Sequence, residues 1–433
     1  MRSALLYLGM AAALAAVGVF QSWNVALAIL NMCLISAVMA LGVNISWGYA
    51  GLFNVGTMGF AALGGVAVVL VSMPPVGAAW SAGGALMLLA GIAVMATAAA
   101  LIYARRRLTG RARTLTTWGI VCVGYVLARL AYTPGASAIE AVDPAATGYL
   151  GGLDLPVILA WAAGGLLAAG AAWIIGRISL GLRSDYLAIA TLGIAEILIF
   201  MMKNEDWLTR GVKNVTGLPR PVPYEVDLRE AAWLVDLAAQ RGMEPATLAA
   251  IVVKLGYTAL FATVLLVLYT LAERALHSPW GRMMRAIRDN RDAAAAMGKD
   301  VTARHLQVFV LGSAVVGIAG AMLTTLDGQF TPGTYNPLRF TFLIWVMVIV
   351  GGSGNNRGAI LGGFLVWFLW IEVETAGPYV MGLITERLDP GSLLHARLTD
   401  AGPHLRLFLM GLLLLLVLRF APRGLIPEES GRR

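Results

Sequence analysis

Long apolar segments recur along the whole chain, and this feature limits the fold more than any other. A helix needs about 20 mostly apolar residues to cross the hydrocarbon core of a bilayer. We therefore expect an all-α polytopic membrane protein with about 9–12 transmembrane or re-entrant helices, plus a short cytoplasmic helix. The candidate segments cover residues 4–22, 27–47, 56–73, 80–103, 115–133, 155–175, 186–202, 249–273, 305–326, 340–351, 358–376 and 404–420. Two of them, 115–133 and 340–351, are candidates for re-entrant or half-buried segments.

The composition excludes several classes of protein. Charged residues make up 13% of the chain and hydrophobic residues 59%, whereas soluble domains are about 25% charged. A cytosolic enzyme, a disordered tail and a disulfide scaffold are therefore excluded. Cys33 and Cys122 both lie inside apolar segments, and we interpret them as packing residues and not as a disulfide or metal site. We interpret residues 4–22 as a retained first helix, not as a cleaved signal peptide.

Basic residues predict the orientation of the chain. Cytoplasmic loops of membrane proteins are enriched in Lys and Arg. Five arginines lie in loop 104–114 without an acidic residue, and seven basic residues lie in 274–304. A cytoplasmic N-terminus and twelve spans put both segments and the C-terminus in the cytoplasm. Loop 203–248, with six basic and seven acidic residues, is then external. Topology accounts for the net charge of +8, so nucleic acid is not an expected partner.

Two polar segments interrupt a chain that otherwise reads as a single transmembrane domain over residues 1–433. The external loop 203–248 has helical spacing of charged and apolar residues over 225–241, which predicts a short amphipathic helix. The cytoplasmic segment 277–304 predicts a helix that starts at Ser278-Pro279. We expect this helix to end at Gly298 with a left-handed backbone.

No sequence motif for covalent chemistry or nucleotide binding is convincing. The chain has no GxxxxGK[ST] motif, so we expect it to bind no ATP or other cofactor itself. Residues 351–354 match the GxSG pattern of intramembrane serine proteases, and His404 opens a later span. However, Ser353 is predicted to lie in a polar, glycine-rich surface turn. We therefore expect a connecting turn there, no metal site and no catalytic residue.

Two features inside the apolar segments suggest a translocation path. Glu196 lies about ten residues into an apolar span, where a charge is costly, so a functional role is the first hypothesis for it. Alternatively, Glu196 pairs with Arg129 or a backbone donor and only orients helices. Residues 47–56 place glycines and an asparagine between two good spans, which indicates either a path-lining break or a close-packed turn. The candidate path residues are Tyr49, Gly51, Asn54, Gly56, Thr191 and Glu196.

Four motifs, in this order along the chain, carry a resemblance to a known family. They are GYAGLFNVG at 48–56, DYLAIATL at 185–192, RMMRAIRDNRDAAAAMGKDV at 282–301 and IVGGSGNNRGAILG at 349–362. From about residue 27 to 426, the chain resembles the M-type permease subunit of the branched-chain amino-acid (Liv) ABC importers. Urea and short-amide permeases share this framework.

The resemblance implies a function and a set of partners. It implies a permease subunit that moves branched-chain or other hydrophobic amino acids by alternating access, in the cytoplasmic (inner) membrane of a bacterium. The implied partners are two ABC ATPase subunits, which bind ATP and Mg, a second permease subunit, usually different from the first, and a periplasmic substrate-binding protein. The 285–298 helix would couple to the ATPase through Arg285, Ala286, Arg288, Asp289, Asp292, Ala293, Ala294 and Gly298.

The chain also departs from the family pattern. Residues 104–154 look like added length, loop 203–248 is longer than expected, and Gly358-Ala359 replaces the usual Gly-Pro.

A secondary transporter or channel, coupled to protons through Glu196, is the main alternative function, although it leaves the 279–298 helix without a role. An intramembrane protease is the third possible function.

Overall fold

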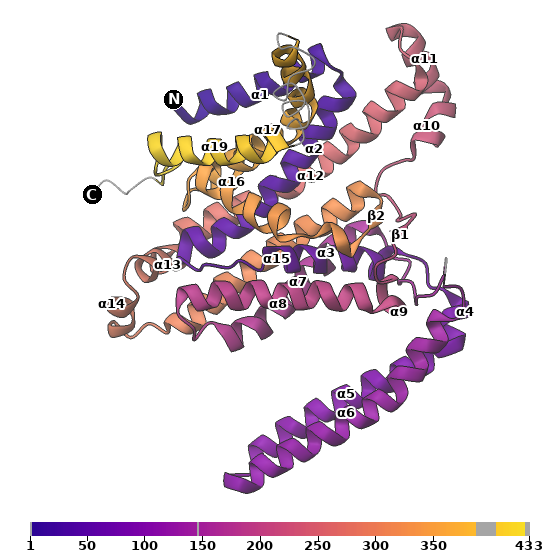
Figure 1. The fold of residues 1–433 in the computed structure, drawn as a ribbon, viewed down its shortest axis with the longest axis vertical. Coiled ribbons are helices and arrows are strands. Elements are labelled where there is room, and N and C mark those ends of the chain that lie inside the picture. Colours follow the sequence, from indigo (N-terminus) through magenta and orange to yellow (C-terminus); the bar gives the residue numbers. More distant parts are fainter. Residues whose placement is uncertain (1, 145–146, 387–403, 429–433) are drawn as a thin grey trace.

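The computed structural model describes residues 2–144, 147–386 and 404–428 and confirms the all-α class (Figure 1). Nine helices in this part of the chain are long and apolar enough to cross a membrane. The long helices are α1 (Arg2–Phe20), α2 (Trp23–Val43) with the π-helical turn η1 (Asn44–Gly48), α5 (Ala85–Arg107) preceded by α4 (Gly77–Ala79) and η2 (Trp80–Gly84), α6 (Gly110–Glu140), α7 (Val157–Ser179), α8 (Ser184–Asn204), α12 (Pro245–His277), α15 (Val301–Asp327) and α17 (Asn356–Thr385).

Shorter elements complete the fold. Three further apolar helices are shorter than the nine long ones. Every apolar segment expected from the sequence overlaps one of these twelve helices. The segment 115–133, a candidate for a re-entrant segment, lies inside the long helix α6. The short apolar helices are α3 (Thr57–Ser72), α16 (Leu343–Gly351) preceded by η4 (Leu338–Phe342), and α19 (Leu405–Phe420). The remaining elements are α9 (Asp206–Thr209), α10 (Glu225–Glu230), α11 (Ala232–Arg241), α13 (Pro279–Asp289), α14 (Arg291–Ala296), η3 (Pro332–Thr334), β1 (Val215–Thr216) and β2 (Gln329–Phe330).

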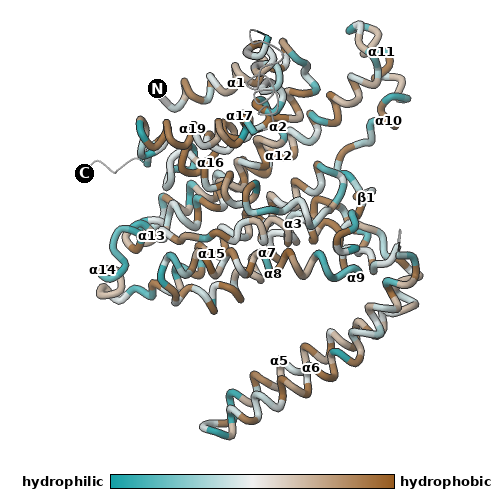
Figure 2. Tube along the Cα trace, in the orientation of Figure 1, coloured by the Kyte–Doolittle hydropathy of each residue, from teal (hydrophilic) through white to brown (hydrophobic). Residues whose placement is uncertain are grey.

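The helices run between two polar ends. The first turns of α1, together with α13 and α14, lie on the left in Figure 1, and we call this the α13 end. The opposite β1 end carries α9, α10, α11 and the antiparallel pair of β1 and β2, in which Val215 is opposite Phe330. Hydrophilic residues gather at α13 and α14, while the helices between the ends are largely hydrophobic (Figure 2).

Small residues allow three core helices to approach closely. A Cβ on Gly64 of α3 would press on the carbonyl oxygen of Gly317 in α15. A Cβ on Gly317 would lie 2.5 Å from the Ala168 side chain and 2.6 Å from the Gly164 carbonyl oxygen, both on α7. Lipid tails are as apolar as the side chains, so close packing between backbones is a main source of stability here. The core of the fold therefore depends on these glycines.

A helical hairpin projects from this core. Helices α5 and α6 pack along each other and point away from the rest of the molecule (Figure 1). The tip holds the arginines of loop 104–114 and is hydrophilic, whereas the flanks are mostly hydrophobic (Figure 2). The tip of this hairpin and its second helix, α6, belong to the added length noted in the sequence.

The helix expected over 225–241 is two helices, which corrects the prediction. Ala231 has φ −70° and ψ 121°, an extended backbone that separates α10 from α11. Leu228 and Leu234 are both buried, yet six residues along one continuous helix would put them on different faces. The break allows both leucines to be buried.

The glycine contacts in the core give the first testable prediction. Gly64→Ala should destabilise the protein by about 1–3 kcal/mol, because overpacking forces α3 and α15 apart. The matched control is Gly170→Ala on α7, where a Cβ meets nothing within 4 Å. Thermal unfolding in detergent should show a lower midpoint for Gly64→Ala alone; equal midpoints would contradict this account of the core.

Candidate functional site

Helix α13 begins where the sequence predicts and lays one face on the body of the protein. The Ser278 hydroxyl accepts a hydrogen bond from the Gly281 backbone N–H at 3.4 Å, and Pro279 occupies the first turn. Met284 and Ile287 are buried beneath the helix. Because these positions are three residues apart, they share one face. The opposite face is left for other contacts.

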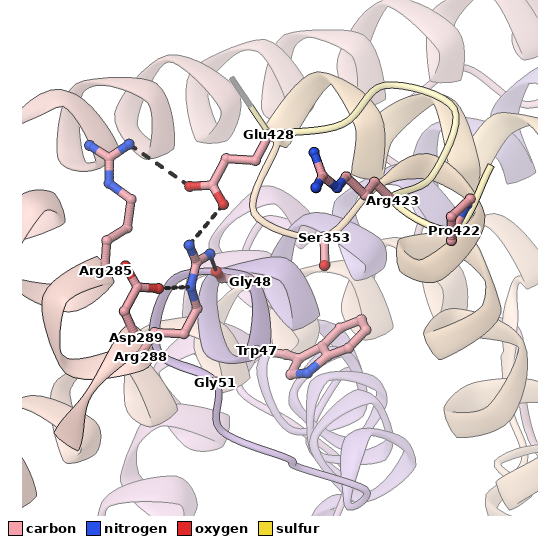
Figure 3. A pocket seen from close by; sticks show the side chains of 10 residues that line it. All are labelled: Trp47, Gly48, Gly51, Arg285, Arg288, Asp289, Ser353, Pro422, Arg423 and Glu428. Atoms are coloured by element: carbon pink, nitrogen blue, oxygen red, sulfur yellow. Dashed lines mark hydrogen bonds and ion pairs between the residues drawn. The ribbon is translucent and has the colours of Figure 1, made fainter. Parts of the chain in front are cut away.

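Two arginines hold α13 against the membrane-embedded body. Arg288 Nη1 donates to the backbone carbonyl oxygen of Gly48, at the end of η1. Arg288 Nη2 lies 2.8 Å from one carboxylate oxygen of Glu428, and Arg285 Nη1 lies 3.9 Å from the other (Figure 3). The Arg288 and Glu428 side chains are each only 25% exposed, so solvent screens this pair less than a surface ion pair. Arg288 thus joins three distant parts of the chain.

A second set of hydrogen bonds joins η1 to the turn before α17. Asn44 is fully buried; its amide donates to Asn356 Oδ1 at 3.0 Å, and its Oδ1 accepts from the Gly354 N–H at 2.8 Å. The Tyr49 hydroxyl donates to the same Asn356 oxygen at 2.5 Å. The amide of Asn356 donates to Glu273 Oε1 of α12 at 3.3 Å. Buried polar groups with complete partners define one arrangement of the surrounding helices.

The segment after α19 fastens this region from the outside. The Leu425 and Ile426 N–H groups donate at 2.9 Å to the carbonyl oxygens of Val350 and Gly351. A Cβ on Gly352, whose φ is 120°, would meet the Ile426 backbone, so only glycine fits this approach. The chain therefore reaches Glu428 in a fixed position beside α13.

These elements enclose a pocket of about 620 Å³ at the α13 end (Figure 3). Its walls combine basic, acidic and aromatic side chains with exposed backbone. The lining residues are Trp47, Gly48, Gly51, Arg285, Arg288, Asp289, Ser353, Pro422, Arg423 and Glu428. Ser353 lies in an exposed turn here, whereas His404 precedes the far end of α19, about 24 Å of helix away. The two do not form a nucleophile and base.

The structure divides the predicted coupling residues into two groups. Arg285, Arg288 and Ala294 are buried or half-buried. The others face outward, and they are Ala286, Asp289, Asp292, Ala293 and Gly298. The expected single helix 285–298 is wrong: Asn290 is extended and caps α14 by accepting from the Ala293 N–H at 2.9 Å. Gly298 does have the predicted left-handed backbone, with φ +76°.

Within the predicted break at 47–56, residues 51–56 are non-helical backbone held by other helices. Thr191 Oγ1 of α8 accepts from the Val55 N–H at 3.1 Å. Thr341 Oγ1 of η4 donates to the Val55 carbonyl at 3.2 Å, and Trp345 Nε1 donates to the Asn54 carbonyl at 3.1 Å. Non-helical backbone within a membrane requires such partners. Side chains of the neighbouring helices therefore hold the break in one conformation.

The predicted path residues do not all share one environment. Tyr49, Asn54, Gly56 and Thr191 are buried around the break, while Gly51 is exposed with φ +68°. A Cβ on Gly56 would press on the Thr191 backbone at 2.6 Å, so the break is also a close-packed turn.

Glu196 differs from the other path candidates. It is exposed on α8 and has no hydrogen-bond or ion-pair partner among the described residues, Arg129 included. Because a lone charge facing lipid is disfavoured, this face of α8 needs protein or water beside it.

Sequence reasoning missed Asn44, Glu273, Asn356 and Glu428. Asn44 and Asn356 at the ends of apolar spans carried a weak signal, since a buried amide needs partners. Nothing local pointed to Glu428, because its partners lie about 140 residues earlier in the chain.

The contacts of Glu428 give a second testable prediction. Glu428→Ala should lower the local opening free energy of α13 by about 1–2 kcal/mol, because a partly buried charge-assisted contact with Arg288 and a weaker one with Arg285 are lost. The control is Asp289→Ala, since this carboxylate is 70% exposed and contacts only the adjacent Arg288; such pairs contribute little. Amide hydrogen exchange of α13 should accelerate in the first variant only. Equal exchange in both would show that Glu428 does not hold the helix.

Comparison with known proteins agrees with this architecture. The sequence profile described as "Branched-chain amino acid transport system / permease component" matches residues 135–418. The chain is 29% identical over 164 residues to the probable branched-chain amino acid transport permease protein LivM of Methanocaldococcus jannaschii, covering 37% of this chain and 43% of the relative. It is 28% identical over 209 residues to the high-affinity branched-chain amino acid transport system permease protein LivM of Escherichia coli, covering 47% of each.

A permease with a different name is also similar. The high-affinity permease protein LivH of Salmonella typhimurium is 25% identical over 202 residues, covering 46% of this chain and 59% of the relative. The chain thus spans about half the length of the curated relatives that it matches. No solved structure matches it. Because the family profile covers well over half of the sequence, the chain belongs to the family of permease components of branched-chain amino acid transport systems.

Proposed function

We propose that this chain is the transmembrane permease subunit of an ATP-driven importer for branched-chain or other hydrophobic amino acids. The observation that carries the proposal is the position of α13. Arg288 anchors one face of this helix to Gly48 of η1 and to Glu428. Asn44 in turn joins η1 to Asn356 of α17 and to the turn before it. The outward face of α13 and α14 presents small and charged side chains.

The contacts suggest how motion would pass through the subunit. A partner that pushes on α13 would move Gly48, since Arg288 binds its carbonyl oxygen. Gly48 belongs to η1, which continues directly into the break at 51–56, and Asn44 ties η1 to the base of α17. Alternating access requires two discrete arrangements of packed elements. We propose that η1, the break and the turn at 352–355 shift together between inward-open and outward-open states.

The proposed assembly follows from the exposed surfaces. Two ATPase subunits, which bind ATP and Mg, would contact α13 and α14. A second permease subunit would cover the exposed face of α8 that carries Glu196. Because the differently named permease LivH is also similar to this chain, we propose that the two permease subunits differ. A periplasmic binding protein would deliver substrate at the β1 end. The α13 end and both termini would then lie in the cytoplasm, with the chain in the inner membrane.

One observation favours a second candidate function. Glu196 is an acidic residue within a span that has no partner among the described residues, as a proton-coupled secondary transporter would require. That function leaves the outward face of α13 unused. Urea and short-amide permeases remain an alternative substrate class within the importer proposal.

Cysteine chemistry tests the importer proposal and gives a third prediction. The exposed native thiol is Cys122, so the background variant is Cys122→Ser. Ala293→Cys in this background should react with an impermeant maleimide only after the cells are opened. In the assembled transporter, it should also crosslink to a co-purifying ATPase subunit. Asp227→Cys, on α10 at the β1 end, is the matched control and should react in intact cells. Reaction of Ala293→Cys in intact cells would refute the topology, and purification without an ATPase would refute ATP coupling.

Glu196 gives a fourth prediction, which separates the two candidate functions. Glu196→Gln keeps the hydrogen-bonding side chain and removes the charge. If ATP drives uptake, we expect this variant to assemble and to retain most transport at two pH values. Complete loss of uptake with normal assembly, together with strong pH dependence of the parent, would favour the secondary transporter.

A further inference from the structure

The α5–α6 hairpin contacts the body of the protein through its base. At the β1 end, Trp207 Nε1 donates to the Tyr132 hydroxyl at 3.1 Å and to Glu205 Oε2 at 2.7 Å. Trp80 Nε1 donates to the Leu150 carbonyl oxygen at 3.0 Å. Tyr and Trp side chains of this kind are enriched where a membrane meets water. The base of the hairpin therefore marks the membrane surface at the β1 end.

Two apolar grooves lie along α6 at the level of this aromatic layer and beside it. The first has a volume of about 410 Å³ and is walled by residues of α5 and α6, among them Gly91, Val94 and Tyr125, together with Trp207 of α9. The second has a volume of about 350 Å³ and is walled by Tyr125, Val126, Leu130 and other residues of α6. Every side chain that lines the second groove is exposed, and in the first groove Val94, Tyr125 and Arg129 are exposed, so both grooves open toward the surroundings of the hairpin.

A single charged side chain stands between the grooves. Arg129 lines both of them. It is the only charged residue in the apolar stretches 77–104 and 114–139 that form the hairpin. Arg129 is exposed, and no described residue hydrogen-bonds or pairs with it. An unpaired guanidinium at membrane depth is costly, so something outside this chain should balance its charge.

The depth of Arg129 indicates the source of that charge. It lies one helical turn from Tyr132, which belongs to the aromatic layer. Arginine side chains extend along an apolar surface to bring the guanidinium to the headgroups, and a guanidinium binds phosphate with a planar pair of donors. Val94 of the first groove and Val126 of the second lie nearer the tip of the hairpin than Tyr132 does, so both grooves extend from this layer into the bilayer. The arrangement places one cationic side chain beside two apolar grooves.

We propose that the hairpin binds one diacyl phospholipid from the leaflet at the β1 end, with its phosphate on Arg129 and one acyl chain in each groove. The lipid would neutralise the single charge within the apolar stretches of the hairpin and fill its two apolar grooves. This site is independent of the amino-acid transport proposed above, since it lies outside α13, the break and the turn at 352–355. A transmembrane helix of a second subunit that carries an acidic residue is the competing occupant.

Two glycines of the hairpin allow a matched test. Gly91 lines the first groove, and a Cβ there meets nothing within 4 Å, so Gly91→Trp should fill the groove without straining the backbone. Gly119 is equally open but lines neither groove, so Gly119→Trp adds the same side chain elsewhere on the hairpin. Arg129→Gln removes the proposed phosphate contact and leaves the grooves open.

The experiment is photocrosslinking of the full chain in nanodiscs that contain phosphatidylethanolamine or phosphatidylglycerol with a diazirine in one acyl chain. Mass spectrometry counts the lipid bound to peptides from 85–107 and 110–140. We expect several-fold less labelling in Gly91→Trp and in Arg129→Gln, and parent labelling in Gly119→Trp, with either lipid. Thermal midpoints should be alike in all four proteins. Equal labelling in every variant would overturn the proposal and leave only general lipid contact; crosslinks from the hairpin to another protein chain, in place of lipid, would overturn it in favour of the helix.

Discussion

The non-helical backbone of residues 51–56 is largely buried, so its polar groups must be hydrogen-bonded, and the rest of the structure depends on this requirement. A buried N–H or C=O without a partner costs about 1–3 kcal/mol. Partners come from Thr191, Thr341 and Trp345, which belong to α8, η4 and α16. The break therefore fixes where α8 and the continuous helix formed by η4 and α16 lie. It also leaves α3 short, with 16 residues between Thr57 and Ser72.

The α13 end links this break to the surface of the protein. Arg288 and Asn44 each bind two groups that are far from them in the sequence. Together they connect α13, η1, the turn at 352–355 and the segment after α19. A network of this kind is stable only when complete, because a buried group without a partner is penalised. Partial movements are therefore disfavoured, and the network should shift as a unit or stay in place. This behaviour suits a subunit that has to convert contact at α13 into a change near the break.

The sequence predicted features that depend on neighbouring residues. Apolar length located every long helix, and local capping located the start of α13 at Ser278 and the left-handed Gly298. It did not predict that Asn290 would end α13, because an asparagine cap inside a helical pattern competes with helix continuation and tertiary contacts decide the outcome. The pairing of Asn44 with Asn356 spans 312 residues, and no local pattern encodes such a contact. The exposed position of Glu196 also required the fold, since periodicity in a span that is apolar on all sides does not show which face is buried.

The central claim is that Arg288 transmits force between α13 and the break, and transport stoichiometry tests it most directly. Arg288→Lys keeps the positive charge but loses the planar fork that binds Gly48 and Glu428 at the same time. The measurement is the number of amino-acid molecules imported per ATP hydrolysed by the reconstituted transporter. The account predicts a several-fold lower ratio in Arg288→Lys, with assembly and ATP hydrolysis close to those of the parent. An unchanged ratio in a correctly assembled variant would contradict it.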